Sequence, residues 1–164
     1  MLSRKFEKIT LLVLFVAGVG SLLNIMRKPP IKDWLIVFLF KGYITTLLDK
    51  VIVKKGYVKY PVQLLNMMDI SFVFDYLLFP ISCVYYNQLT HKSSAMGTFL
   101  KVFIFSIPMT IVETWFERHT QLVKYKKGWN WIVTFISLTV TFLGVRLFLA
   151  FIRKASEKQE QSNG

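Results

Sequence analysis

A stripe of polar residues runs through an apolar stretch at residues 97–122. Ser106, Thr110, Glu113 and Glu117 follow one another at spacings of four, three and four residues. This spacing places all four on one face of a helix. Carboxylates that share a low-dielectric site with few positive charges do not all stay ionised, and proton relays and cation sites use such an arrangement. The stripe therefore predicts a helix face that is turned away from lipid.

Other charged residues inside apolar stretches are candidates to meet Glu113. Lys41 lies near the middle of residues 34–53, and Asp49 and Asp75 fall in the same half of a membrane as Glu113 when successive stretches alternate in direction. We predict an intramembrane polar network of Lys41, Asp49, Asp75 and Glu113. Two interpretations stay open: a structural ion pair that fixes helix register, or a pathway for a proton, a cation or a small polar solute.

The elements that must position these residues are long apolar helices. Hydrophobic residues make up 54% of the 164-residue chain and mean hydropathy is +0.46, which is too apolar for a soluble domain of this size. Five stretches are long enough to cross a hydrocarbon core. They lie at about residues 9–26, 34–53, 70–89, 97–122 and 131–152. The sequence therefore predicts an all-α integral membrane bundle, a single domain over residues 1–152, with a polar, disordered tail at 153–164.

Two segments leave the number of spans at four or five. Residues 9–26 could be a cleaved signal peptide after Arg4, Lys5 and Lys8, although the apolar run continues to Met26 and favours a retained helix. Residues 60–69 are apolar enough to lie on or dip into the membrane and could form an interfacial turn of helix that leads into the third span.

The net charge of +12 comes from short basic runs between the apolar stretches, which is a membrane signature and argues against nucleic acid as a partner. Over five spans, eleven Lys and Arg residues fall on the N-terminal side and seven on the other. We therefore predict a cytoplasmic N-terminus and a C-terminus on the opposite side.

The loop after residue 117 is predicted to contact the interface and anionic lipid, through Glu117, Arg118, Lys124, Lys126 and Lys127. Tyr125, Trp129 and Trp131 are expected at the headgroup level.

Motifs for enzymes and cofactors are missing from the sequence. No pattern of metal ligands, phosphate-binding loop or nucleophile with an adjacent base occurs, and the single cysteine, Cys83, cannot form an intrachain disulfide. Glu113 and Glu117, one turn apart, could serve acid–base chemistry on a lipid headgroup, but the loops are too short to build an enzyme pocket. We expect no enzymatic activity, no metal and no cofactor.

Two longer stretches resemble the signature regions of a known family. "FDYLLFPISCVYYNQLT" (residues 74–90) and "ETWFERHTQLVKYKKGWNW" (residues 113–131) are similar to those of a family of small, uncharacterised multi-spanning membrane proteins of endospore-forming Firmicutes. The start, "MLSRKFEKITLLVLF", and "KYPVQLL" extend the resemblance over nearly the whole chain. The resemblance implies a bacterial cytoplasmic membrane protein and suggests a setting linked to sporulation. It carries over no catalytic residue.

Two functions follow from these observations. The leading hypothesis is a non-enzymatic structural or interaction component of the bacterial membrane, which would act with a membrane-protein partner or a second copy of itself. The alternative is a small channel or proton-coupled carrier that uses the intramembrane acidic residues. A dry seam with Lys41 paired favours the first, and a continuous polar cavity favours the second.

Overall fold

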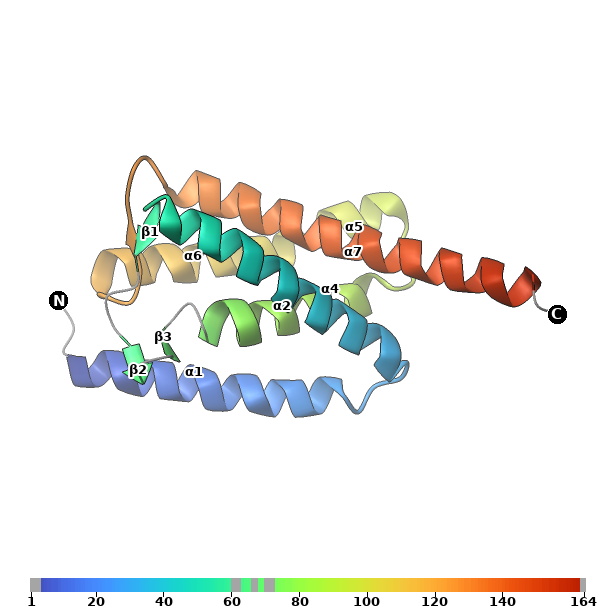
Figure 1. Cartoon of the computed structure of the whole chain (residues 1–164), viewed down its shortest axis with the longest axis horizontal. Coiled ribbons are helices and arrows are strands. Elements are labelled where there is room, and N and C mark those ends of the chain that lie inside the picture. The colour runs from blue at the N-terminus through green and yellow to red at the C-terminus, as the bar shows by residue number, and fades with distance from the viewer. Residues whose placement is uncertain (1–3, 60–62, 66–67, 70–72, 163–164) are drawn as a thin grey trace.

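The computed structural model describes residues 4–59, 63–65, 68–69 and 73–162. Long helices lie side by side along one axis (Figure 1). The helices are α1 (Arg4–Ile25), α2 (Ile31–Lys54), the π-helix η1 (Phe74–Leu78), α4 (Phe79–Thr90), α5 (Ala95–Lys101), α6 (Phe103–His119) and α7 (Trp131–Ser162). Two short antiparallel pairs complete the fold: β1 (Val58–Lys59) with β4 (Lys124–Tyr125), and β2 (Gln63–Leu65) with β3 (Met68–Asp69). The second pair lies where an interfacial turn of helix was predicted, so that prediction is wrong for the described residues of this segment.

The helices alternate in direction, so that the two termini lie at opposite ends (Figure 1). The start of α1 lies at the same end as the β1–β4 pair, and we call this the cap end. The connections from α1 to α2 and from α4 to α5 lie at the other end, where α7 carries the chain out of the bundle. Arg153 of α7 contacts Asp33 and His91 there, and we call it the clasp end.

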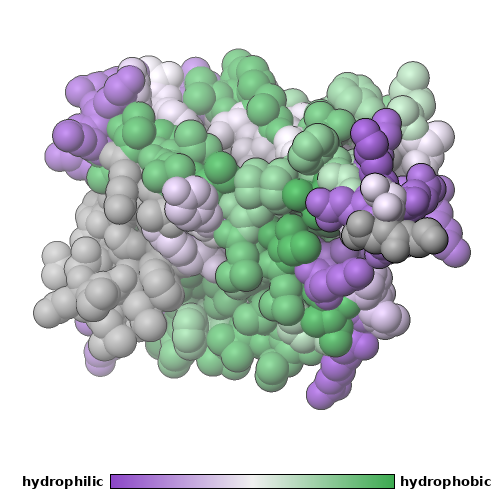
Figure 2. Space-filling view, turned by 45° about the vertical axis from the view of Figure 1, so that its right-hand side comes forward, coloured by the Kyte–Doolittle hydropathy of each residue, from purple (hydrophilic) through white to green (hydrophobic). Residues whose placement is uncertain are grey.

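Three helical segments are long and apolar enough to cross a membrane: Lys5–Ile25, Ala95–His119 and Trp131–Ser162. Figure 2 shows apolar side chains over the middle of the molecule and hydrophilic ones toward its ends. The prediction of an all-α fold is confirmed, and the three candidate spans agree with a multi-pass membrane protein. The segment predicted at 97–122 ends at His119, where the Thr120 hydroxyl donates to the Phe116 carbonyl at 2.6 Å and closes the helix.

Helix α2 is more charged than these three, but its two faces are clearly divided. Asp33, Val37, Lys41 and Thr45 recur every fourth residue and are buried. The opposite face carries a stripe of exposed residues at the same spacing, namely Leu35, Leu39, Tyr43, Leu47 and Val51. A helix with an apolar outer face and a polar inner face suits a place between lipid and a polar interior.

Proline sets the local shape of the chain segment between α2 and α5. Pro80 has no backbone N–H to give to the preceding turn, so a regular α-helix cannot run through this point without adjustment. The turn before it widens into η1, which continues directly into α4. This segment packs closely on α1, because a side chain at Gly18 would meet Leu77 Cδ2 at 2.5 Å. The π-turn thereby places Phe74 and Asp75 toward the interior.

The C-terminal tail differs from its prediction. Residues 153–164 were expected to be disordered because they are polar, but α7 continues as a helix through Ser162. Helix nucleation is the costly step, and it has already occurred in the apolar part of α7. Residues such as Glu157 and Lys158 are good helix formers, so they extend a helix that they would not start alone. The prediction of a disordered tail is therefore wrong for residues 153–162.

Candidate functional site

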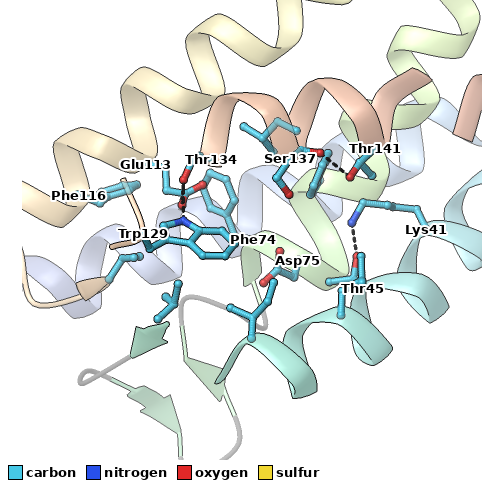
Figure 3. A pocket seen from close by; sticks show the side chains of 16 residues that line it. Lys41, Thr45, Phe74, Asp75, Glu113, Phe116, Trp129, Thr134, Ser137 and Thr141 are labelled. Atoms are coloured by element: carbon cyan, nitrogen blue, oxygen red, sulfur yellow. Dashed lines mark hydrogen bonds between the residues drawn. The ribbon is translucent and has the colours of Figure 1, made fainter. Parts of the chain in front are cut away.

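A cavity with a volume of about 110 Å³ lies inside the bundle at the cap end (Figure 3). It is formed by α2, η1, the start of α4, α6, α7 and the cap, by which we mean the β1–β4 pair with the loop of residues 120–130. Its polar lining consists of Lys41, Thr45, Asp75, Glu113, Thr134, Ser137 and Thr141. Its apolar lining consists of Leu48, Ile52, Val58, Phe74, Phe79, Phe116, Val123, Trp129 and Leu138. The site therefore combines charges, hydroxyls and aromatic rings in one space.

Glu113 is held in place by residues from the cap and from α7. Its Oε1 accepts a hydrogen bond from the Tyr125 hydroxyl at 2.8 Å and another from the Thr134 hydroxyl at 3.2 Å. The Trp129 indole N–H donates to the same Thr134 oxygen at 3.0 Å. One carboxylate thus ties α6, α7 and the cap together, and it does so on the wall of the cavity.

The inward contacts of Tyr125 and Trp129 were not predicted from the sequence. Both were expected at the headgroup level, which stays a prediction, and in the structure both point toward the Glu113 and Thr134 cluster. Burial, together with the negative charge of Glu113, raises the pKa of the Tyr125 hydroxyl. Tyr125 therefore stays a neutral donor to the carboxylate. The signal that could have found this contact is the 12-residue separation of Glu113 and Tyr125, which a helix end followed by a tight turn can bring together.

Lys41 lies at the inner limit of the cavity. The side chain is 2% exposed, and its ammonium donates to the Thr45 hydroxyl one turn along α2. The ammonium also lies 3.7 Å from the centroid of the Phe79 ring, which is cation–π geometry. Asp75 is near enough to act on it electrostatically. A buried lysine thus has a hydroxyl, a ring face and a carboxylate to offset its loss of hydration.

The structure brings three of the four predicted network residues around one cavity. Lys41, Asp75 and Glu113 all line it, whereas the side chain of Asp49 lies outside the described part of the structure. The hydrogen bonds of Glu113 go to Tyr125 and Thr134, and that of Lys41 goes to Thr45. A direct link between Lys41 and Glu113 therefore stays a prediction.

The predicted interfacial residues gather at the cap end. The carbonyl of Glu117 accepts from Lys124 Nζ at 2.6 Å, and the carbonyl of Lys55 accepts from Lys127 Nζ at 2.5 Å. Arg118 and Lys126 are exposed. Glu113 lines the cavity but Glu117 does not, so the glutamate pair considered for acid–base chemistry does not converge on it. The lysines fix the cap while keeping their charge near the surface.

A buried glutamate that the sequence did not single out also fixes the cap end. Glu7, near the start of α1, is buried, and its Oε1 accepts from the Gln121 backbone N–H at 2.7 Å. The amide follows the end of α6, so the bond joins α1 to the start of the cap loop. In the sequence, Glu7 is one acidic residue among basic residues, and this pattern does not predict its contact with the loop.

In the described part of the chain, the cavity does not continue toward the clasp end. On α7 its lining runs from Thr134 to Thr141, roughly 10 Å at the helical rise per residue. Beyond it, Phe142 packs against Phe79, Tyr86 and Phe105, with ring centroids 5.3–5.6 Å apart. Phe40 of α2 stacks on Phe148 of α7 at 3.6 Å. The space is therefore open toward one half of the bundle only.

No grouping of three or more His, Cys, Asp or Glu side chains suited to a metal ion occurs in the described residues. No protein-family model matches the chain, and no similar protein was found among curated proteins or solved structures. The chemistry and shape of the cavity are therefore the features that bear on the function of this protein.

Proposed function

We propose that this chain is a five-helix integral protein of a bacterial cytoplasmic membrane, with α2 and the η1–α4 segment as the two further spans. The alternating helix directions and the exposed apolar stripe of α2 support five crossings. The bacterial setting follows from the family resemblance, and the excess of basic residues at the cap end favours a cytoplasmic N-terminus.

The function that the cavity supports best is non-enzymatic binding from the cap side of the membrane. The observation that carries this proposal is the one-sided shape of the cavity. Its α2 lining, from Lys41 to Ile52, covers roughly 16 Å, about half of a hydrocarbon core of about 30 Å. A channel needs a polar path through the whole core, and here the second half is packed with the rings of Phe142, Tyr86 and Phe105.

Flux through proteoliposomes tests this proposal against the channel or carrier. We expect proton and potassium flux no greater than in protein-free vesicles, with an added ionophore as the positive control. Flux above that background that disappears in Glu113→Gln would contradict the binding proposal, and it would favour a proton-coupled carrier instead.

Labelling of single cysteines tests the five-span topology. The background is Cys83→Ala, which removes the native thiol. Cysteine would then replace Lys126 at the cap end or Glu160 on the exposed end of α7. A membrane-impermeant maleimide is expected to modify the two positions from opposite sides of the membrane. Modification of both from the same side would show an even number of spans.

A further inference from the structure

We propose that the cavity binds the ammonium group of an amine-headed amphiphile, with phosphatidylethanolamine as the type of lipid, and that Glu113 is the counter-ion. This inference rests on the binding function proposed above and gives it a ligand class. Four features of the site carry it: the balance of charge, the aromatic walls, the place where the cavity opens, and its size.

The charge balance calls for one positive group. The described lining contains one ammonium, Lys41, and two carboxylates, Asp75 and Glu113. Lys41 and Asp75 act on each other electrostatically. Glu113 instead receives hydrogen bonds from two neutral hydroxyls, which stabilise its charge without cancelling it. The part of a ligand that lies against Glu113 would therefore carry a positive charge.

The walls around Glu113 suit an ammonium group. Phe74, Phe116 and Trp129 line the same part of the cavity, and Figure 3 shows them around the Glu113 carboxylate. Aromatic faces attract alkylammonium groups through cation–π interactions. A primary ammonium also has N–H groups to donate, and the hydroxyls of Ser137 and Thr141 lie along the same wall. The site thus offers partners for both the charge and the hydrogen bonds of the group.

The cavity reaches the surface between α2 and α7, on the side that would face lipid. Leu48 of α2 and Ser137 of α7 line the cavity and are also exposed. Next to them, Leu47 and Val140 are exposed apolar residues. Nearer the clasp end, the Phe40–Phe148 stack closes the space between the same two helices. A lipid could place its headgroup inside at the cap end while its chains stay along the outer faces of α2 and α7.

The size of the cavity fits a headgroup and excludes whole chains. A buried water needs about 10–15 Å³ of such volume, so about 110 Å³ holds several waters. Space for several waters suits a small polar group such as an ethanolammonium. The acyl chains must remain outside, which agrees with the opening between α2 and α7.

Lipid competition in detergent tests the inference. The purified full-length chain would be titrated with phosphatidylethanolamine, with phosphatidylglycerol of the same chains, and with free ethanolamine, and bound lipid would be measured by native mass spectrometry. The variants are Glu113→Gln and, as a matched control one turn away and outside the cavity lining, Glu117→Gln. We expect phosphatidylethanolamine to bind preferentially, and Glu113→Gln to weaken it about tenfold or more. Glu117→Gln should bind like the unmodified chain.

The other outcomes decide against the inference in identifiable ways. Equal binding by Glu113→Gln and Glu117→Gln would place the lipid elsewhere on the protein. Preference for phosphatidylglycerol would mean that Lys41 or the cap lysines select an anion. Binding of free ethanolamine as strong as that of the lipid would replace the amphiphile with a soluble amine. The flux assay separates the two proposals: absence of flux with no amine preference overturns the ligand alone, whereas flux that depends on Glu113 overturns the binding function itself.

Discussion

The two halves of this helix bundle are built from the same helices, but one interior is packed and the other is open. At the clasp end, aromatic rings fill the interior. There the Oδ2 atom of Asp33 lies 2.6 Å from Arg153 Nη2 and 2.7 Å from Arg153 Nε. At the cap end, Lys41, Asp75 and Glu113 surround open space. The change occurs within a single turn of α7, between Thr141 and Phe142.

Packing alone does not account for the open half. A cavity forfeits the contacts that its lining would otherwise make, and buried charges lose their hydration. The clasp end shows that this chain can fill the same interhelical space with phenylalanine. The polar residues at the cap end therefore favour a ligand. The following variants test this difference between the packed and the open half.

Phe142→Ala should have the largest effect on stability. Phe142 is fully buried and contacts three other rings, so its loss leaves a hole that the helices cannot fill. We expect a loss of about 3–5 kcal/mol in the free energy of unfolding in detergent. Phe151→Ala is the matched control, because Phe151 lies on the same helix but is exposed. A small effect of Phe142→Ala would mean that the clasp half is not tightly packed.

Lys41→Met tests whether the charges of the open half depend on one another. Removing the ammonium takes away a positive charge that acts on Asp75, and a buried charge that loses such compensation is destabilising, so we expect a loss of stability smaller than that of Phe142→Ala. The double variant Lys41→Met with Asp75→Asn should recover part of that loss. Glu113→Gln should be mild, because an amide oxygen can still accept from Tyr125 and Thr134. Thermal unfolding of the singles and the double measures the coupling, and strict additivity would show that Lys41 and Asp75 act independently.

Sequence periodicity predicted which helix faces turn inward because burial of polar groups away from lipid is a strong and local constraint. Ser106 and Thr110 are buried, and Glu113 lines the cavity, as the spacing of four and three residues implied. The cap could not be predicted in this way. Tyr125 and Trp129 have the residue types of a headgroup belt, and only the pairing of β1 with β4 turns them toward Glu113. The aromatic packing that closes the clasp half could not be predicted either, because sequence alone does not show which phenylalanines contact one another across helices.

Neutralising the cap lysines should weaken the binding of anionic lipid. Lys124, Lys126 and Lys127 lie together on the cap, and each lysine near a membrane surface contributes about 1 kcal/mol to binding of anionic lipid. Their triple change to Gln should therefore reduce bound phosphatidylglycerol in native mass spectra. The control is the triple change at the clasp end, Lys28, Lys32 and Lys92 to Gln. Equal loss from both triples would show a general effect of charge and no preference for the cap.

The clasp should make the packed half sensitive to pH, although the effect is the smallest because His91 is largely exposed. Arg153 Nη1 lies 2.7 Å from His91 Nδ1. Arginine can only donate, so Nδ1 must be unprotonated. Burial comes first among the causes that lower the pKa of His91, followed by the positive charges of Arg153, Arg146 and Lys92, while Asp33 opposes them.

The folded protein therefore binds this proton less tightly than the unfolded chain does. Stability from this contact is complete above the unfolded pKa of about 6.5 and falls as pH drops from there through the lower, folded pKa. Thermal unfolding between pH 7.5 and about 5.5 should show a decrease that His91→Gln reduces. His119→Gln is the control, because His119 belongs to α6 at the cap end. If His119→Gln removes the dependence and His91→Gln does not, the pH-sensitive contact belongs to the open half, and the contrast between the two ends is reversed.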